Sequence, residues 1–392
     1  MVNELIGQPV ISKRVSEIPK SAIHEMTRLS KQIEDVAFLS WAKPTSDTPE
    51  HIKQAASSAI LEGKVGGYSE PGGLIQLREA VVKKLNKYNK IDASPQEVVV
   101  TVGAIEGLAA AIMSVVDPGD EVIIPVPGYS THIRQVQLAS GKPVCVPTIE
   151  QEGFKLDLDK IENSITEKTR AIMYSDPNNP TGSVYSLDEL THLAEIAKKH
   201  NLIVITDEAY EYFTYDNNPH LSIASLPGMK DRVISVFTFT KTYAMTGWRI
   251  GYLHAVTDLV NQIKKAHIPM AICAPVVSQY AALAALNNSQ ECVDIFRNHY
   301  LKTRNLMCER LDKLTDIFSY IRPAGSYLMF PKIQGERGED SISFAKNLLN
   351  QAGVSTTPGI AFQGESHLRM SFCVPEQMIN KAFDRMEKYF KI

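Results

Sequence analysis

The 392-residue chain is predicted to be an α/β protein: a parallel sheet covered by helices on both faces, followed by a smaller α+β unit. Three observations favour this class. Short runs rich in Val and Ile recur, helical stretches separate most of them, and long helices take over after about residue 257. The composition, with 44% hydrophobic and 22% charged residues, is that of an ordinary globular protein with ample core.

Periodicity predicts the elements in order. Residues 74–88, 104–116 and 187–200 carry apolar side chains at helical spacing. Short apolar runs bounded by turn residues predict buried strands. These strands span residues 97–101, 121–126, 142–147, 170–175, 202–207 and 232–240.

The C-terminal part has a different character. Helices are predicted to about residue 320, and short strands at 327–333, 354–359 and 368–372 then surround a helix at 341–353. The first ~45 residues are too few to fold alone, so they are expected to pack on this unit. The predicted domains are therefore 46–289, and 1–45 together with 290–392.

Charge and cysteine content exclude several classes. A net charge of −3 gives no reason to expect binding to nucleic acid or to anionic membranes. The five cysteines form no CxxC pair, which favours reduced thiols in the cytoplasm and argues against a zinc site. Neither a signal peptide nor a membrane-spanning stretch is expected.

Ligands of an open α/β sheet bind where its strands end, so the residues just past each strand are candidates. Gly103, Ala104 and Ile105 follow the first strand and open a helix, whose N-terminal amides can hold an anion. The same pattern also suits a tight turn. Tyr129 follows the second strand, where it can stack on a flat ligand or fill the core.

Two further strands end in polar residues. The stretch "DPNNPTG" at 176–182 is a rigid loop in which Asn179 offers a side-chain amide. Asp207 ends an apolar strand, and Tyr210 follows three residues later. A carboxylate at the end of a buried strand needs a cation, although Asp207 also suits a helix N-cap.

Three basic residues complete the set. Lys241 lies just past the last strand, where burial lowers the pKa of an amine and makes it a nucleophile toward carbonyls. A lysine that reaches solvent is the alternative interpretation. Arg249 in "GWRIGY" and Arg369 in "LRMSF" lie among apolar residues, where an arginine needs an anionic partner.

Pyridoxal 5'-phosphate (PLP) requires all of these parts. Its phosphate needs the amide cradle and an arginine, its ring needs an aromatic neighbour, and its aldehyde needs a lysine. A carboxylate keeps the pyridinium nitrogen protonated, and donors bind the ring hydroxyl. The second arginine suits the α-carboxylate of an amino acid. The sequence therefore predicts a PLP site.

The chain resembles class I PLP-dependent aminotransferases of fold type I, the aspartate/aromatic/alanine aminotransferase group, over nearly its whole length. The stretches that carry the resemblance are "GGYSEPGGLIQLREA", "DPGDEVIIPVPGY", "DPNNPTG", "DEAYEYF" and "TKTYAMTGWRIGY". The resemblance implies a large domain with a mostly parallel seven-stranded sheet and a smaller α+β domain built from both ends of the chain.

Residue roles follow from the same resemblance. Lys241 is implied to bond the cofactor as an internal aldimine and to shuttle the α-proton, and Asp207 to pair with the pyridinium nitrogen. The other implied contacts are Tyr210 and Asn179 at the ring hydroxyl, Tyr129 on the ring, Ala104, Ile105, Thr238 and Arg249 at the phosphate, Tyr68 at the phosphate of the neighbouring subunit, and Arg369 with Asn179 at the substrate carboxylate.

The sequence departs from the family pattern at several positions. Thr238 stands where serine is usual and keeps the hydroxyl. Ala42 stands where a glycine usually lines the substrate site, and Trp41 beside it can bound an apolar side chain or pack in a surface loop. Ile105 stands where some aspartate-using relatives have lysine. The family also implies cis peptide bonds before Pro127 and Pro180.

The implied activity is transfer of the amino group of an L-amino acid to a 2-oxo acid, through the Lys241 aldimine and a pyridoxamine form. The donor is expected to have an aromatic, aliphatic or other neutral side chain, or to be glutamate. Other PLP reactions at the α-carbon stay open: β-elimination, cyclising elimination or oxidation. A homodimer is expected, without nucleic-acid or membrane partners. A PLP-binding regulator is disfavoured because the chain has no extra basic domain.

Overall fold

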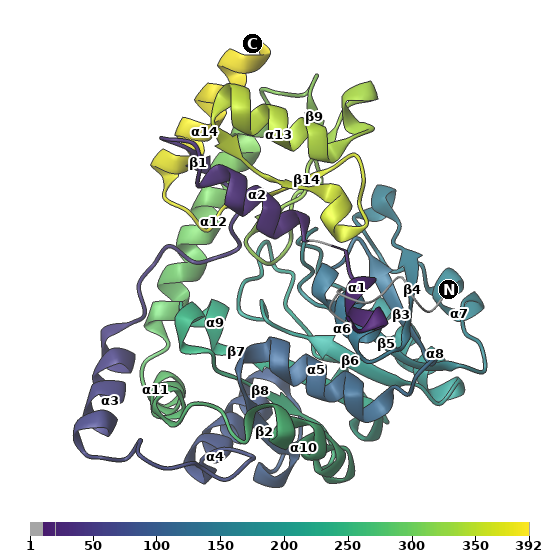
Figure 1. Cartoon of the computed structure of the whole chain (residues 1–392), viewed down its shortest axis with the longest axis vertical. Coiled ribbons are helices and arrows are strands. Elements are labelled where there is room, and N and C mark those ends of the chain that lie inside the picture. The colour runs from purple at the N-terminus through teal and green to yellow at the C-terminus, as the bar shows by residue number, and fades with distance from the viewer. Residues whose placement is uncertain (1–10, 20, 392) are drawn as a thin grey trace, which may run out of the picture.

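The computed structural model describes residues 11–19 and 21–391, and its centre is a seven-stranded sheet. A second group of helices and short strands lies above this sheet in Figure 1. The strands of the sheet are β2 (Val98–Thr101), β3 (Glu121–Val126), β4 (Lys142–Pro147), β5 (Thr169–Ser175), β6 (Ile203–Asp207), β7 (Val233–Thr238) and β8 (Gly251–His254).

The strand order is β2-β8-β7-β6-β5-β3-β4. All neighbours from β7 to β4 are parallel, and β8 is antiparallel to both β7 and β2. Six of these strands are the predicted ones. The α/β class and the mostly parallel seven-stranded sheet are thus confirmed. β8 was not predicted from its own residues, because "GYLH" is short and carries a glycine and a histidine.

The predicted strand 232–240 ends early. β7 stops at Thr238, whose hydroxyl accepts a hydrogen bond from the Thr240 amide and so caps a short helix, α9 (Phe239–Thr242). β4 is an edge strand, which explains how it tolerates two prolines that cannot donate to a ladder.

Alternate residues of each strand enter two separate cores. Val98 and Val100 pack on one face of the sheet and Val99 on the other. The helices of the first face are α3 (Glu50–Leu61), α4 (Ile75–Lys84), α7 (Leu158–Asn163), α8 (Leu187–Lys199) and α11 (Val276–Asn287). Those of the second are α5 (Gly103–Val115), α6 (Ser130–Leu138) and α10 (Thr257–Ala271). Within the described residues, no helix has the length and apolarity to cross a membrane.

A third core joins the two ends of the chain. β1 (Ala37–Phe38) pairs with β12 (Val354–Ser355), and α2 (Ala22–Ser30) packs near the C-terminal elements, as Figure 1 shows. In the N-terminal segment, α2 and β1 thus lie against C-terminal elements, whereas α1 lies against α6 of the sheet unit, and residues 1–10 lie outside the described part. The other elements are α1 (Lys13–Ser16), α12 (Glu291–Leu311), α13 (Ser341–Ala352), α14 (Glu376–Phe390), β9 (Phe318–Ser319), β10 (Leu328–Met329), β11 (Lys332–Ile333), β13 (Thr357–Pro358) and β14 (Leu368–Ser371).

Two of the predicted C-terminal strands are each divided in two. The predicted strand 327–333 becomes β10, which pairs with β14, and β11, which pairs with β9. Pro331 lies between them and cannot donate a ladder hydrogen bond. The predicted strand 354–359 becomes β12 and β13, which pair with β1 and β14. In both cases the chain changes partner within the run.

A buried ion pair lies behind the end of β6. The Lys84 ammonium donates to both carboxylate oxygens of Glu211, at 2.5 and 2.6 Å, and lies 4.4 Å from the centre of the Phe237 ring. Asn89 donates a further hydrogen bond to Glu211. Burial lowers the pKa of Lys84, while Glu211 acts in the opposite direction. Through Glu211, the ion pair holds in place the segment that follows Asp207.

Removing one partner of this pair is expected to be costly. Lys84→Met leaves the Glu211 carboxylate buried without its cation, so the free energy of unfolding should fall by about 3–5 kcal/mol. The double variant Lys84→Met/Glu211→Leu removes both charges and should recover most of the loss. Urea unfolding of the three proteins checks this. A Lys84→Met protein as stable as the parent would show that Glu211 is not held as an ion.

Candidate active site

A cavity of about 500 Å³ opens where β6 and β7 end and where α5 and α6 begin. Elements of the sheet form its floor, and the segment after β1 together with β14 closes it from the other side. Every predicted site residue except Tyr68 lines this cavity. They are Trp41, Ala42, Ala104, Ile105, Tyr129, Asn179, Asp207, Tyr210, Thr238, Lys241, Arg249 and Arg369.

One end of the cavity is built to hold an anion. Ala104 and Ile105 lie in the first turn of α5, where helix amides have no partner within the helix. Arg249 reaches the same place and, among the described residues, donates only to the Thr246 carbonyl. Gly103 permits this approach, because a Cβ on it would lie 2.5 Å from the Arg249 guanidinium, and its φ is +71°.

The hydroxyls of Thr238 and Thr240 lie 2.9 Å apart at this end. Thr238 caps α9 and was predicted as part of the site. Thr240 also lines the cavity, and sequence reasoning missed it. The signal was available, since the residue lies two positions after a capping threonine at the end of a strand.

Asp207 lies in the middle of the cavity, at the carboxyl end of β6, and is buried. Its carboxylate lies 3.3 Å from Nε2 of the buried His132 and accepts a hydrogen bond from the Ala209 amide. His132 packs edge-on against Tyr129, with ring centroids 5.5 Å apart. Sequence reasoning missed His132, although its position one helical turn after Tyr129 placed it on the same helix face.

Lys241 extends from α9 into the cavity. Its ammonium donates to the Ala42 carbonyl at 2.6 Å and lies 5.8 Å from the Tyr210 ring and 5.7 Å from the Tyr327 ring. Burial lowers the pKa of Lys241 to about 8, and nearby Arg369 and Arg249 act in the same direction. Burial also raises the pKa of Tyr210. The amine is thus a stronger nucleophile at neutral pH than an exposed lysine.

Arg369 lies at the other end, on β14, and is almost completely buried. Its guanidinium donates to the Ser40 carbonyl at 2.9 Å and to the Asn179 amide oxygen at 3.3 Å, and it stacks on the Phe362 ring at 4.7 Å. Burial lowers the pKa of Arg369. Among the described residues, no carboxylate pairs with Arg369 or with Arg249. A buried guanidinium in this state calls for an anion from outside the chain.

The loop from Asp176 to Gly182 places Asn179 by means of its backbone. The peptide bonds before Pro177 and Pro180 are cis, and so is the bond before Pro127. Cis bonds before Pro127 and Pro180 were predicted, and the one before Pro177 was not.

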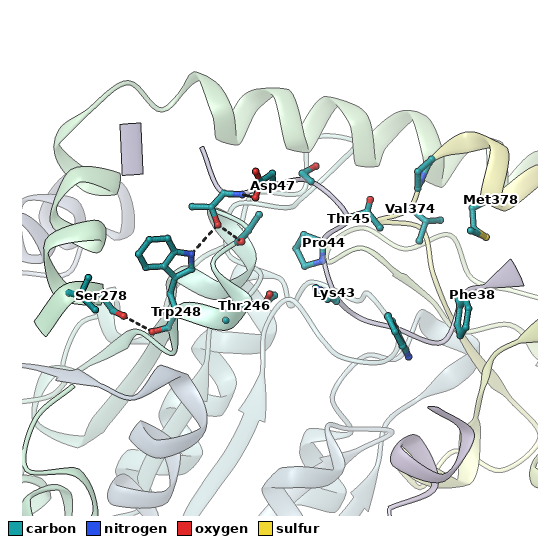
Figure 2. Close-up of a pocket in the computed structure, with 17 residues that line it drawn as sticks. Phe38, Lys43, Pro44, Thr45, Asp47, Thr246, Trp248, Ser278, Val374 and Met378 are labelled. Carbon is teal, nitrogen blue, oxygen red and sulfur yellow. Dashed lines mark hydrogen bonds between the residues drawn. The ribbon is translucent and has the colours of Figure 1, made fainter. Parts of the chain in front are cut away.

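Tyr68 lies away from the cavity. Its side chain is 81% exposed, in a surface hollow that also contains Ile60 and residues 273–277. A larger cavity of about 950 Å³ lies between the two places, lined by residues 43–48 and by Trp248 and Ser278 (Figure 2). Trp41, Lys43 and Thr246 line both this larger cavity and the candidate site.

The residues present fit PLP. The cavity offers a cationic amide cradle at one end, a carboxylate in the middle, and an amine of lowered pKa beside it. The cradle has room because Gly103 carries no Cβ. The second cation, Arg369, lines the same cavity from β14. Such an arrangement can bind a phosphate and a carboxylate at once and hold an amine nucleophile between them.

Comparison with known proteins gives the same result. The family model described as aminotransferase class I and II matches residues 35–386. The chain is 38% identical to aromatic-amino-acid aminotransferase 2 of Thermococcus litoralis and to an aspartate aminotransferase of Pyrococcus abyssi, over 97% of this chain and 98% of each relative. An aromatic aminotransferase of Pyrococcus horikoshii is 37% identical with a TM-score of 0.88, and covers 94% of this chain and 98% of its own.

An aspartate aminotransferase of Thermus thermophilus, solved with maleate, is 32% identical with a TM-score of 0.92, over 97% of this chain and 100% of its own. These relatives share the fold and the type of reaction and differ in the substrate that they name. The chain therefore belongs to the class I and II aminotransferases, and it is a PLP-dependent enzyme that transfers amino groups.

Proposed function

We propose that the enzyme transfers the amino group of an L-amino acid with a neutral side chain, or of glutamate, to a 2-oxo acid. One observation carries this proposal: the buried Arg369 guanidinium has no carboxylate partner in the described chain and shares a cavity with Lys241. An α-carboxylate bound there brings the α-carbon toward the lysine. The elimination and oxidation alternatives have no support in the names of the relatives, which are all aminotransferases.

The cofactor, when bound, supplies an aldehyde that takes up amines and a protonated ring that draws electrons from the α-carbon. Lys241 would hold the cofactor covalently and, when free, would move the α-proton at its Nζ. The carboxylate of Asp207, which lies 3.3 Å from His132, would keep the ring nitrogen protonated. The remaining roles are Tyr210 and Asn179 at the ring hydroxyl, Tyr129 on the ring face, and Ala104, Ile105, Thr238 and Arg249 at the phosphate.

The preference for a neutral side chain is supported by the rim of the cavity. Trp41 is 37% exposed beside Ala42, and Ile105 and Ile23 add apolar surface. The relatives named for aromatic amino acids are consistent with such a rim.

We also propose a homodimer in which Tyr68 binds the phosphate of the neighbouring subunit. Its high exposure and its separation from the cavity support a role in the partner. Large apolar side chains are exposed nearby, in the segment around Ile60 and Leu61 and at the end of α10 around Ile272. A surface of this kind typically contacts a partner. The larger cavity beside Trp248 would face the same partner (Figure 2).

Two further assignments are part of the proposal. The chain divides into a large domain, 46–289, and a small domain of 1–45 with 290–392, which the third core and the β1–β12 pair support. Residues 1–10 of this division lie outside the described part. A cytoplasmic location agrees with the five cysteines, all of which are free thiols.

The lowered pKa of Lys241 predicts how the cofactor-free protein captures PLP. Only the unprotonated amine reacts, so the rate of covalent capture should rise with pH around a midpoint near 8. Stopped-flow absorbance measures this rate. Lys241→Ala should capture no PLP covalently and should lose multiple turnover. Retained turnover in this variant would place the reactive amine elsewhere.

Arg369→Ala should weaken substrate binding more than cofactor binding. Loss of the guanidinium that binds the substrate carboxylate by two parallel hydrogen bonds should raise the KM for the amino acid on the order of 100-fold. Arg369→Lys is the matched control, since it keeps the charge but not the two parallel donors. Equilibrium dialysis of PLP reports cofactor retention. Preferential loss of PLP would move Arg369 to the phosphate end.

The role of Tyr68 is tested with mixed dimers. Tyr68→Phe should weaken PLP retention about tenfold through loss of one charge-assisted hydrogen bond. Co-expression of Tyr68→Phe and Lys241→Ala chains then gives dimers with one intact site, if Tyr68 acts across the interface. Normal retention at that site is the expected result. Weak retention in the mixed dimer would mean that Tyr68 serves its own chain.

A further inference from the structure

Residues 40–43, here called the strap, cross the cavity as irregular backbone. Three of their four carbonyls accept hydrogen bonds from side chains of the site. The Ser40 carbonyl accepts from Arg369 at 2.9 Å, and the Lys43 carbonyl accepts from the Cys373 thiol at 3.3 Å. The strap is thereby held at both ends by the C-terminal part of the chain.

The middle carbonyl, that of Ala42, has two donors. Lys241 donates at 2.6 Å and the Tyr327 hydroxyl at 3.1 Å. Tyr327 is fully buried in the turn before β10, and its ring packs edge-on against Tyr210 at 5.0 Å. Its hydroxyl therefore has a fixed position. In the described chain, these two side chains are the only donors to this carbonyl within hydrogen-bond distance.

The two donors differ in how long they can stay hydrogen-bonded to the Ala42 carbonyl. An amine that bonds covalently to a cofactor and is later released must leave the Ala42 carbonyl and return to it. A partly buried carbonyl without any donor is costly and tends to turn toward another partner. Tyr327 does not line the cavity and is fully buried, so its hydroxyl can stay in place while Lys241 moves.

Resting on the function proposed above, we infer that Tyr327 is a positioning residue for Lys241. Its hydroxyl keeps the Ala42 carbonyl oriented as the docking point for the Lys241 amine whenever that amine is not bonded to the cofactor. Because both donors share one acceptor, Tyr327 also limits how strongly the carbonyl stabilises the protonated form of the amine. The hydroxyl thus favours an amine that is in place and ready to accept a proton.

Several other groups act on the charge of Lys241, and one of them, Tyr210, also packs against the Tyr327 ring. These groups are Asp207 at the end of β6, Tyr210 in the turn after β6, Arg249 before β8, Arg369 on β14 and Cys373 two residues after β14. Burial raises the pKa of the Cys373 thiol to about 11, so this thiol stays protonated and donates to the strap.

The test compares Tyr327→Phe with Tyr300→Phe. Tyr300 is also fully buried and packs on the Tyr327 ring at 5.3 Å, but it makes no hydrogen bond to Ala42. The first readout is the pH dependence of reductive methylation of Lys241 by formaldehyde in the full-length, cofactor-free chain, followed by peptide mass spectrometry. Tyr327→Phe should raise the midpoint by about half a pH unit or more, since the carbonyl is left to the ammonium alone.

The second readout is the single-turnover half-reaction of the holoenzyme with an amino acid. Its rate constant should fall about tenfold in Tyr327→Phe, because the amine loses its docking point, while the apparent substrate affinity changes less than about twofold. Tyr300→Phe should leave both readouts unchanged. Identical results for the two variants would show that Tyr327 only fills space.

If Tyr327→Phe does not fold, 3-fluorotyrosine at position 327 replaces it. This residue keeps the shape and donates more strongly, so the labelling midpoint should move to lower pH, and an unmoved midpoint would overturn the inference. Failure of the proposed function would look different. A parent protein without any half-reaction would refute transamination, whereas the labelling of Lys241 would still test the Tyr327–Ala42–Lys241 contact.

Discussion

The site depends on holding positive charge in a cavity without neutralising it. Arg369 and Arg249 donate to backbone carbonyls, one amide oxygen and one threonine hydroxyl, and no carboxylate of the described chain pairs with either. The buried Nε of Arg369 has no hydrogen-bond partner among the described residues. Burying a cation in this way is unfavourable until an anion binds. The fold must therefore provide the stability elsewhere, and the ligand's phosphate and carboxylate provide the missing charges. The same burial lowers the pKa of Lys241 between them.

The sheet supplies that stability because successive residues of a strand point to opposite faces, so one residue can line the cavity while the next is buried. At the end of β6, Asp207 lines the cavity, whereas Glu208 is buried beside Thr206 and Ser222, which donate to its carboxylate. Glu211 likewise faces Lys84 behind the strand end. One short segment thus carries a carboxylate that lines the cavity on one side and a buried polar network on the other. The network restricts the backbone that carries Asp207.

The second group of helices and short strands, above the sheet in Figure 1, closes the site with backbone as well as side chains. The strap accepts hydrogen bonds from Arg369, Lys241 and Tyr327, which come from β14, α9 and the turn before β10. Arg369, Lys241 and the strap are therefore connected by hydrogen bonds. Any movement of the C-terminal elements relative to the sheet changes the position of the Ala42 carbonyl. Ala42 lines the cavity, and its carbonyl accepts two of these hydrogen bonds.

The sequence by itself determined the class of fold, six of the seven central strands and half of the residues that line the cavity. Those just past a central strand could be predicted because the carboxyl ends of parallel strands meet at one edge. The two arginines were predicted from their apolar surroundings, and Trp41 and Ala42 from the family resemblance. Only the tertiary structure revealed β8, the division of the C-terminal strands, His132 beside Asp207, and the two donors to Ala42. These contacts join positions as far apart as 199 and 285 residues. A hydrogen bond to a backbone carbonyl places no requirement on the acceptor's side chain, so the local sequence cannot predict it.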